Sequence, residues 1–245
     1  MRLSKALLIT AKDVKIFRKK PVIIYSLVGF EVLVAIVLPV ILHRVATQGH
    51  QPGIVLPKLI DAFSIWFVIG AAVMPVGIAS YSLVGEKLQR SLEPLLAAPV
   101  SDDEILVGKA LAALLPTFAT TYVGAVIFMA LVDAFADGTL HYRVYPNATI
   151  GVILLALVPL VSLFSVGVNV LISSRANDVR TAQQLGAVIP ALPLGAIYVL
   201  TEVGAITLSV PTLWFIAAVL AVLDVLTIYA TLRTFRRDQI LTAWT

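Results

Sequence analysis

The chain has 245 residues, of which 60% are hydrophobic and 13% are charged, and it contains no cysteine. Soluble domains carry about 25% charged residues, so this composition excludes an ordinary water-soluble enzyme or nucleic-acid-binding protein. The lack of cysteine excludes disulfides, thiolate metal sites and a cysteine nucleophile, and the net charge of +4 has to be interpreted from its distribution along the chain.

Residues 1–20 are predicted to form an amphipathic helix on a membrane surface. At 100° per residue, one face is apolar and the opposite face is basic. The apolar face contains Leu3, Ala6, Leu7, Val14 and Phe17, and the basic face contains Lys5, Lys12, Lys15 and Lys19. Pro21 marks the turn into the next segment. The helix is either an anchor that only sets the topology or an element that transmits force to the first span.

Residues 21–245 are predicted to form an all-α integral membrane domain with six transmembrane helices. A bilayer core of about 30 Å requires about 20 apolar residues of helix, and backbone groups in lipid must be satisfied within the segment. The predicted spans are 22–42, 62–84, 105–132, 148–172, 183–200 and 211–232. The polar stretches 43–61 and 133–147 are predicted to be external connections. The short, still apolar stretch 201–210 is predicted to re-enter the membrane.

Lysine and arginine are concentrated on one side of these spans. Six spans place both termini on the same side, which has 15 Lys and Arg residues, whereas the other side has three. Such residues are enriched in cytoplasmic loops. Both termini are therefore predicted to be cytoplasmic, in a multi-pass protein of the cell membrane.

The connection between the second and third spans is predicted to contain a short amphipathic helix at 86–97. Its apolar ridge consists of Leu88, Leu92, Leu95 and Leu96, and its polar side of Glu86, Lys87, Gln89, Arg90 and Glu93. Ser101 and Glu104 follow with the spacing of a capping box at the start of the third span. The segment is either an ordinary solvated connection or a docking helix for a cytoplasmic partner.

Motifs for ATP hydrolysis and for membrane proteases are missing from the sequence. A phosphate-binding loop requires GxxxxGK[ST], but Ala110 follows the single Gly108–Lys109 pair and Asp103 replaces the first glycine. The histidines His43, His50 and His141 all fall in predicted external connections. We therefore expect no catalytic residue, no metal site and no cofactor bound by this chain, and an intramembrane enzyme is disfavoured.

Two acidic residues fall inside predicted spans, Glu31 in the first and Asp224 in the sixth. A charged side chain at the bilayer centre costs about 2.5–3.5 kcal/mol on insertion scales and therefore faces protein or a cavity. Glu31 either lines a pathway or subunit interface or bonds to a neighbouring helix. Asp224 either has such a role or extends toward the inner surface. The alternative function is an ATP-independent secondary transporter or channel driven by an ion gradient, with Glu31 and Asp224 as a proton or sodium relay.

The stretch 86–109 resembles the signature region of permeases of the type-2 ABC exporter (ABC-2) family. That region has Glu and Arg ahead of Leu-Glu-x-Leu-Leu-x-x-Pro-Val-Ser and then Glu-Ile-Leu-x-Gly-Lys. The matching residues are Glu86, Arg90, Leu92, Glu93, Leu95, Leu96, Pro99, Val100, Ser101, Glu104, Ile105, Leu106, Gly108 and Lys109. Pro94 departs from the pattern, in which an aliphatic residue is usual. More weakly, residues 5–17 resemble the connecting helix of the family, and residues 173–184, with Arg175, Asp178 and Arg180, resemble its second cytoplasmic loop.

This resemblance implies the transmembrane domain of an ABC exporter. The chain would be a permease subunit that forms a homodimer or heterodimer in membrane lipid and exports a hydrophobic or amphipathic substrate. Two copies of a separate cytoplasmic ABC ATPase would hold ATP and Mg²⁺, and nucleic acid is not among the expected partners. The ATPase would contact a coupling helix at 86–97 through Glu86, Lys87, Arg90, Leu92, Glu93, Leu95 and Leu96.

Overall fold

The computed structural model describes residues 3–48, 52–88, 100–140, 143–176, 178–203, 207 and 209–234. Within these ranges all regular elements are helical. The N-terminal helix α1 (Leu3–Phe17) precedes six helical segments that are long and apolar enough to cross a membrane. The predicted all-α fold with six spans is confirmed.

Several of the spans consist of more than one helical element. The first contains α2 (Pro21–Val32), the π-helical turn η1 (Leu33–Val37) and α3 (Leu38–Gln48), and the second contains α4 (Pro52–Ser64) and α5 (Trp66–Leu88). The third is α7 (Asp102–Leu140), and the fourth contains α8 (Ala148–Val152), the π-helical turn η2 (Ile153–Leu157) and α9 (Val158–Arg175). The fifth is α10 (Val179–Glu202) and the sixth is α11 (Val210–Thr234).

The stretches predicted to be external connections are partly helical, and the candidate spans extend into them at 43–47, 55–61 and 133–135; an external position of the remainder stays a prediction. α3 continues to Gln48 and α7 to Leu140. His43 consequently lies in a helix, with its ring 4.7 Å from that of Phe135 on α7. α3 and α7 pack against each other, and this packing explains why both helices continue beyond the ends of their apolar runs. His50, His141 and part of the predicted re-entrant segment 201–210 lie outside the described residues, so the re-entrant segment stays a prediction.

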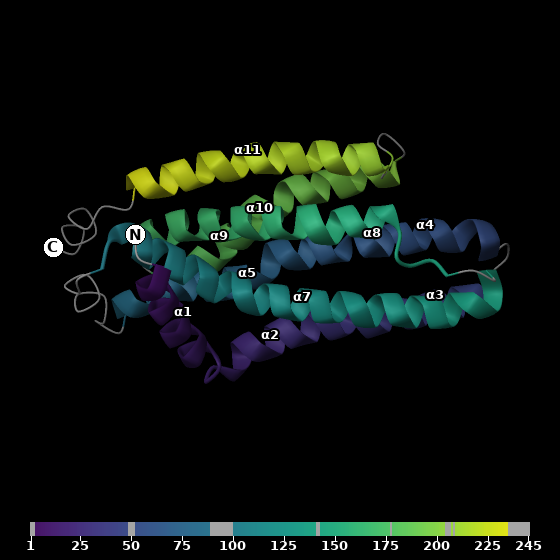
Figure 1. The fold of residues 1–245 in the computed structure, drawn as a ribbon, viewed down its shortest axis with the longest axis horizontal. Coiled ribbons are helices and arrows are strands. Elements are labelled where there is room, and N and C mark those ends of the chain that lie inside the picture. Colours follow the sequence, from purple (N-terminus) through teal and green to yellow (C-terminus); the bar gives the residue numbers. More distant parts are fainter. Residues whose placement is uncertain are drawn as a thin grey trace.

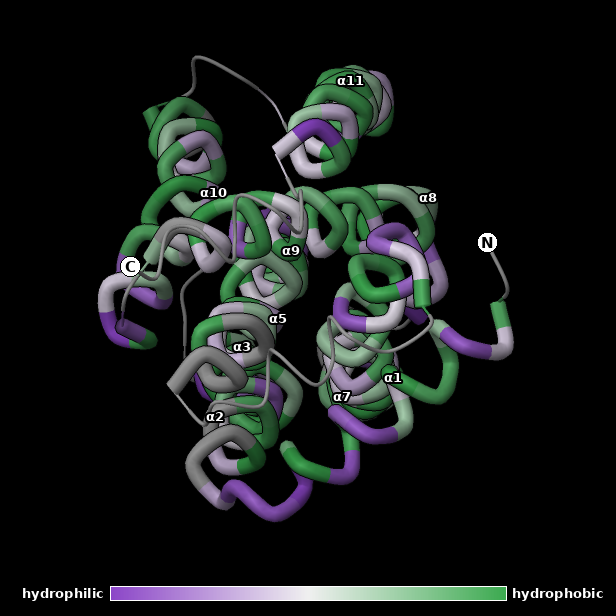
Figure 2. The backbone as a smooth tube through the Cα atoms, turned by 90° about the vertical axis from the view of Figure 1, so that its left-hand side faces the viewer, coloured by the Kyte–Doolittle hydropathy of each residue, from purple (hydrophilic) through white to green (hydrophobic). Residues whose placement is uncertain are grey.

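The six spans run along the long axis of the molecule, and α1 crosses one end of the bundle (Figure 1). We call this the α1 end; it also contains the last turns of α5 and α9 and the first turns of α7 and α10. α9 occupies the centre, in contact with α5, α7, α10 and α11. Viewed along the bundle, α10 and α11 lie on one side and α2, α3 and α7 on the other (Figure 2).

Two apolar clusters form the core. The cluster farther from α1 includes Phe67, Phe128 and Leu157. The cluster at the α1 end includes Ile78 of α5, Ile105 of α7, Val166 of α9, and Ile9 and Phe17 of α1. α1 is therefore part of the packed core as well as a helix at its surface.

The apolar face predicted for α1 is confirmed only in part: Ala6 and Phe17 are buried, and Val14 packs against the core cluster at the α1 end. The buried residues are Ala6, Ile9, Thr10, Asp13 and Phe17, whereas Leu3 and Leu7 are 65% and 54% exposed. The buried residues still follow helical spacing, but two of them are polar. A prediction that assigns every polar residue to the solvent side selects a different face, because the partners of Thr10 and Asp13 lie about 100 positions away on α7.

Candidate functional site at the α1 end of the bundle

The predicted coupling segment begins where α5 ends. Glu86 and Lys87 belong to the last turn of α5. The remaining predicted coupling residues, Arg90, Leu92, Glu93, Leu95 and Leu96, lie outside the described residues, and their contact with an ATPase stays a prediction. α5 ends and α7 begins at the α1 end (Figure 1), so the connection between them is attached at this end.

The predicted capping box at the start of α7 is confirmed. The Ser101 amide donates to Glu104 Oε2 at 3.0 Å, and the Glu104 amide donates to Ser101 Oγ at 3.3 Å. Together with Asp102 and Asp103, Glu104 also places negative charge in the first turn, where it interacts favourably with the helix dipole. The segment that leads out of the predicted coupling helix therefore enters a firmly capped span.

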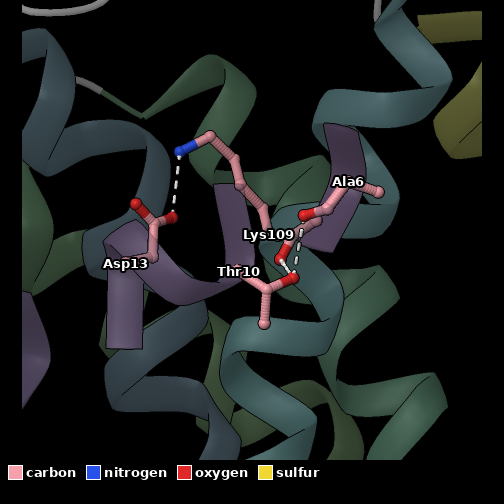
Figure 3. A network of polar contacts seen from close by, with 5 residues as sticks. Ala6, Thr10, Asp13 and Lys109 are labelled. Carbon is pink, nitrogen blue, oxygen red and sulfur yellow. Dashed lines mark hydrogen bonds and ion pairs between the residues drawn. The ribbon is translucent and has the colours of Figure 1, made fainter. Parts of the chain in front are cut away.

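The backbones of α1 and α7 approach closely at Gly108. A Cβ atom at this position would lie 2.8 Å from the Ala6 carbonyl oxygen and 2.8 Å from Ile9 Cβ. The Thr10 hydroxyl is 3.0 Å from both the Ala6 and the Gly108 carbonyl oxygens and can donate to either (Figure 3). Only glycine leaves room for this contact, which explains one residue of the signature on physical grounds.

The neighbouring signature residue, Lys109, forms a buried ion pair with Asp13 of α1. The Lys109 Nζ lies 3.5 Å from Asp13 Oδ2, and the two side chains are 1% and 4% exposed (Figure 3). Removing one partner of a buried pair leaves an uncompensated charge and costs about 3–5 kcal/mol. Sequence reasoning did not single out Asp13. The available signal was an acidic residue on the stripe of α1 that also contains Ala6, Ile9 and Phe17.

The second predicted cytoplasmic loop joins α9 and α10 at the same end. α9 ends at Arg175, and the Asp178 carboxylate accepts a hydrogen bond from the Thr181 amide at 2.7 Å. Hydrogen bonds from the Thr181 side chain and backbone hold the pKa of Asp178 below its usual value. Asp178 therefore caps α10 as a carboxylate, while Arg180 is exposed beside it. A role of this loop toward a partner stays a prediction.

Glu31 is buried between α2 and α7. The Thr121 hydroxyl of α7 donates to its Oε1 at 2.9 Å, and Gly124 lies against its Oε2, where a Cβ would overlap it. Oε2 has no hydrogen-bond partner among the described residues. The bond to Thr121 agrees with the alternative that Glu31 bonds to a neighbouring helix. A role of Glu31 in a pathway or subunit interface stays a prediction.

Asp224 is 3% exposed on α11, and neither of its carboxylate oxygens has a hydrogen-bond partner in the described part of the chain. α11 packs against α9, α8 and η2. α11 and α2 lie on opposite sides of the bundle in both views (Figures 1 and 2). Glu31 and Asp224 are therefore not brought together, and an ion relay between them would have to cross the helices in between.

Among the described residues, no group of three or more His, Cys, Asp or Glu side chains is arranged to hold a metal ion. The model of the ABC-2 type transporter family matches residues 5–194 of the chain, which includes the capping box, Gly108, Lys109 and most of α1. No curated protein matches the chain.

Proposed function

We propose that this chain, which belongs to the ABC-2 type transporter family, is the permease subunit of an exporter for a hydrophobic or amphipathic molecule. Members of this family are the membrane-embedded transport component and not the ATPase, and they generally work with an ABC ATPase subunit. The six spans and the family together make the chain a multi-pass membrane protein and an ABC transporter permease.

In the proposed assembly, two permease copies, identical or different, form the pathway in the cell membrane. Two ATPase subunits bind at the α1 end, which faces the cytoplasm, and they hold ATP and Mg²⁺. Closure of the ATPases on ATP displaces the segment 86–97 and changes the packing of the two permease copies. Few fixed charges in the spans favour an apolar cargo, because a polar cargo needs polar groups along its path.

The observation that carries this proposal is the convergence of three features at one end of the bundle. α1 crosses that end, α5 and α9 end there, and α7 and α10 begin there (Figure 1). The sequence also predicts 15 of the 18 Lys and Arg residues on this side of the membrane. An apolar ridge with a charged rim, as predicted for 86–97, suits docking in a groove of a partner.

The test is co-purification of the chain with a cytoplasmic ATPase. We expect the wild-type chain to retain an ABC ATPase in mild detergent, and the Leu92→Ala/Glu93→Ala variant to lose most of it while inserting normally, because an anchor of the ridge and a rim charge are both removed. The control Arg44→Ala/Lys58→Ala removes two exposed charges from the opposite end and should retain the ATPase.

Two outcomes would contradict the proposal in different ways. A wild-type chain that retains no ATPase, yet transports cargo with an ion gradient alone, would support the secondary transporter instead. If an ATPase binds equally well to the Leu92→Ala/Glu93→Ala variant, the chain is still a permease subunit, but the segment 86–97 is not part of the interface with the ATPase.

A further inference from the structure

α1 is attached to both helices that flank the predicted coupling segment. On α7 it contacts Gly108 and Lys109, as described above. On α5, the Tyr81 ring makes an edge contact with Phe17, with centroids 6.4 Å apart, and the Lys20 ammonium just beyond α1 lies 3.1 Å from the Tyr81 centroid. Because α5 leads into the segment and α7 leads out of it, α1 bridges the segment's two attachment points.

The Asp13–Lys109 pair is not needed to pack α1 against the bundle. Ile9 and Phe17 already place α1 in an apolar cluster. A buried ion pair is often no more stabilising than apolar side chains of similar volume, but separating its partners costs about 3–5 kcal/mol. Any sliding or rotation of α1 on α7 would separate Asp13 from Lys109, so the pair opposes alternative positions of α1.

We propose that Asp13 and Lys109 are positioning residues that hold α1 in a single register on α7, so that the two helices move as one body. This inference rests on the proposed function only for the origin of the movement, which is displacement of the segment 86–97 by an ATPase. Without the pair, α7 would move and α1 would slip against it.

The movement of α1 also reaches the first span. Only residues 18–20 separate α1 from α2. Their amides bond back to the end of α1, with Arg18 N 3.0 Å from the Val14 carbonyl oxygen and Lys20 N 2.9 Å from that of Phe17. A turn held by these bonds transmits displacement better than a loose linker. The pair therefore couples the start of the third span to the start of the first.

The absence of cysteine allows spin labels to be attached to introduced cysteines alone. We would label Ala11, exposed on α1, and Leu115, 48% exposed on α7. The distance between the labels would be measured by double electron–electron resonance on the full chain in lipid nanodiscs. The intact pair should give one narrow distance distribution.

The deciding variant is Asp13→Leu/Lys109→Met, which replaces the ion pair by apolar side chains of similar volume. Such replacements often leave stability unchanged or increase it. The thermal unfolding midpoint of the variant should therefore not fall, while the distance distribution between the labels broadens. The reversed pair Asp13→Lys/Lys109→Asp should restore a narrow distribution if it folds. Lys15→Met, which removes an exposed charge from α1, is the matched control. A narrow distribution in Asp13→Leu/Lys109→Met would show that packing alone fixes α1 and would overturn the proposal.

A second measurement tests transmission in the complex with the co-purified ATPase. Labels on Ala11 and on Val222, 61% exposed on α11, report the position of α1 relative to the bundle before and after addition of Mg-ATP and vanadate. The wild-type distance should shift, and the shift should disappear in Asp13→Leu/Lys109→Met although ATP hydrolysis continues. An unchanged shift in that variant would contradict the role of the pair. Failure to find an ATPase would refute the proposed function, while the nanodisc measurement would still decide whether the pair holds α1.

Discussion

Three buried polar side chains among the described residues meet a glycine of a neighbouring helix. In each case a Cβ on the glycine would overlap the facing side chain or backbone. The three pairs are Thr10 with Gly108, Glu31 with Gly124, and Asn169 with Gly186. Helices in lipid gain little from the hydrophobic effect when they associate, so close approach and interhelical hydrogen bonds contribute more. Glycine provides the approach that lets the polar groups meet.

Replacing Gly124 by Ala is expected to destabilise the protein. The added methyl group overlaps Glu31 Oε2, and forcing extra volume into a packed site costs about 1–3 kcal/mol. The apparent unfolding midpoint in detergent should therefore fall. Gly77→Ala is the matched control, because its Cβ meets nothing within 4 Å and alanine favours the helix. In a Glu31→Ala background the loss should shrink, and an undiminished loss there would show that the clash involves another group.

At the scale of elements, the connection between α7 and α8 is held from three sides. The Asp133 carboxylate accepts the amides of Val144 and Tyr145 at 2.9 and 3.0 Å. The Tyr145 hydroxyl lies 2.9 Å from Ser64 Oγ of α4, and the Tyr145 side chain is buried in the core cluster that contains Phe128. This connection therefore joins α4, α7 and α8 at the end opposite α1.

Burial raises the pKa of the Tyr145 phenol above its ordinary value of 10.0; the hydrogen bond with Ser64 partly opposes this, and the charges of Asp61 and Asp133 add smaller increases. A group whose folded pKa is raised contributes stability below its unfolded pKa, and this stability is lost as the pH rises through the folded pKa. The wild-type unfolding midpoint should therefore fall more steeply above about pH 10 than that of Tyr145→Phe.

The phenylalanine variant should also lose about 1 kcal/mol near neutral pH, because the bond to Ser64 is gone. Tyr25→Phe, at a residue that is 74% exposed, is the control and should follow the wild-type pH profile. Equal alkaline sensitivity of wild type and Tyr145→Phe would assign the transition to another group.

At the scale of the whole molecule, the six spans could be predicted from sequence because the bilayer imposes a minimum apolar length on each helix. The capping box could be predicted because its two residues lie three positions apart. The buried face of α1 could not, since Asp13 and Thr10 are buried by partners on α7 that periodicity does not reveal. The helical ends of α3 and α7 were missed for the same reason: packing, not apolar length, extends them.

The outer faces of α10 and α11 show what surrounds the molecule. α10 is the least buried of the six spans, and large apolar side chains such as Leu192, Phe215 and Val225 are 66–70% exposed. A soluble protein rarely exposes a contiguous apolar surface of this kind. Within a bilayer the same surface contacts acyl chains, and in the proposed dimer part of it is available to the second copy.

The orientation of the whole molecule in the membrane decides whether an ATPase can reach the α1 end. The distribution of Lys and Arg predicts that this end is cytoplasmic. In otherwise cysteine-free chains, Thr47→Cys at the opposite end should react with a membrane-impermeant maleimide in intact cells, whereas Lys15→Cys on α1 should react only after permeabilisation; both positions are exposed. Labelling of Lys15→Cys in intact cells would place the 86–97 segment outside, beyond the reach of any cytoplasmic ATPase, and the proposed coupling would then be impossible whatever the family of the chain.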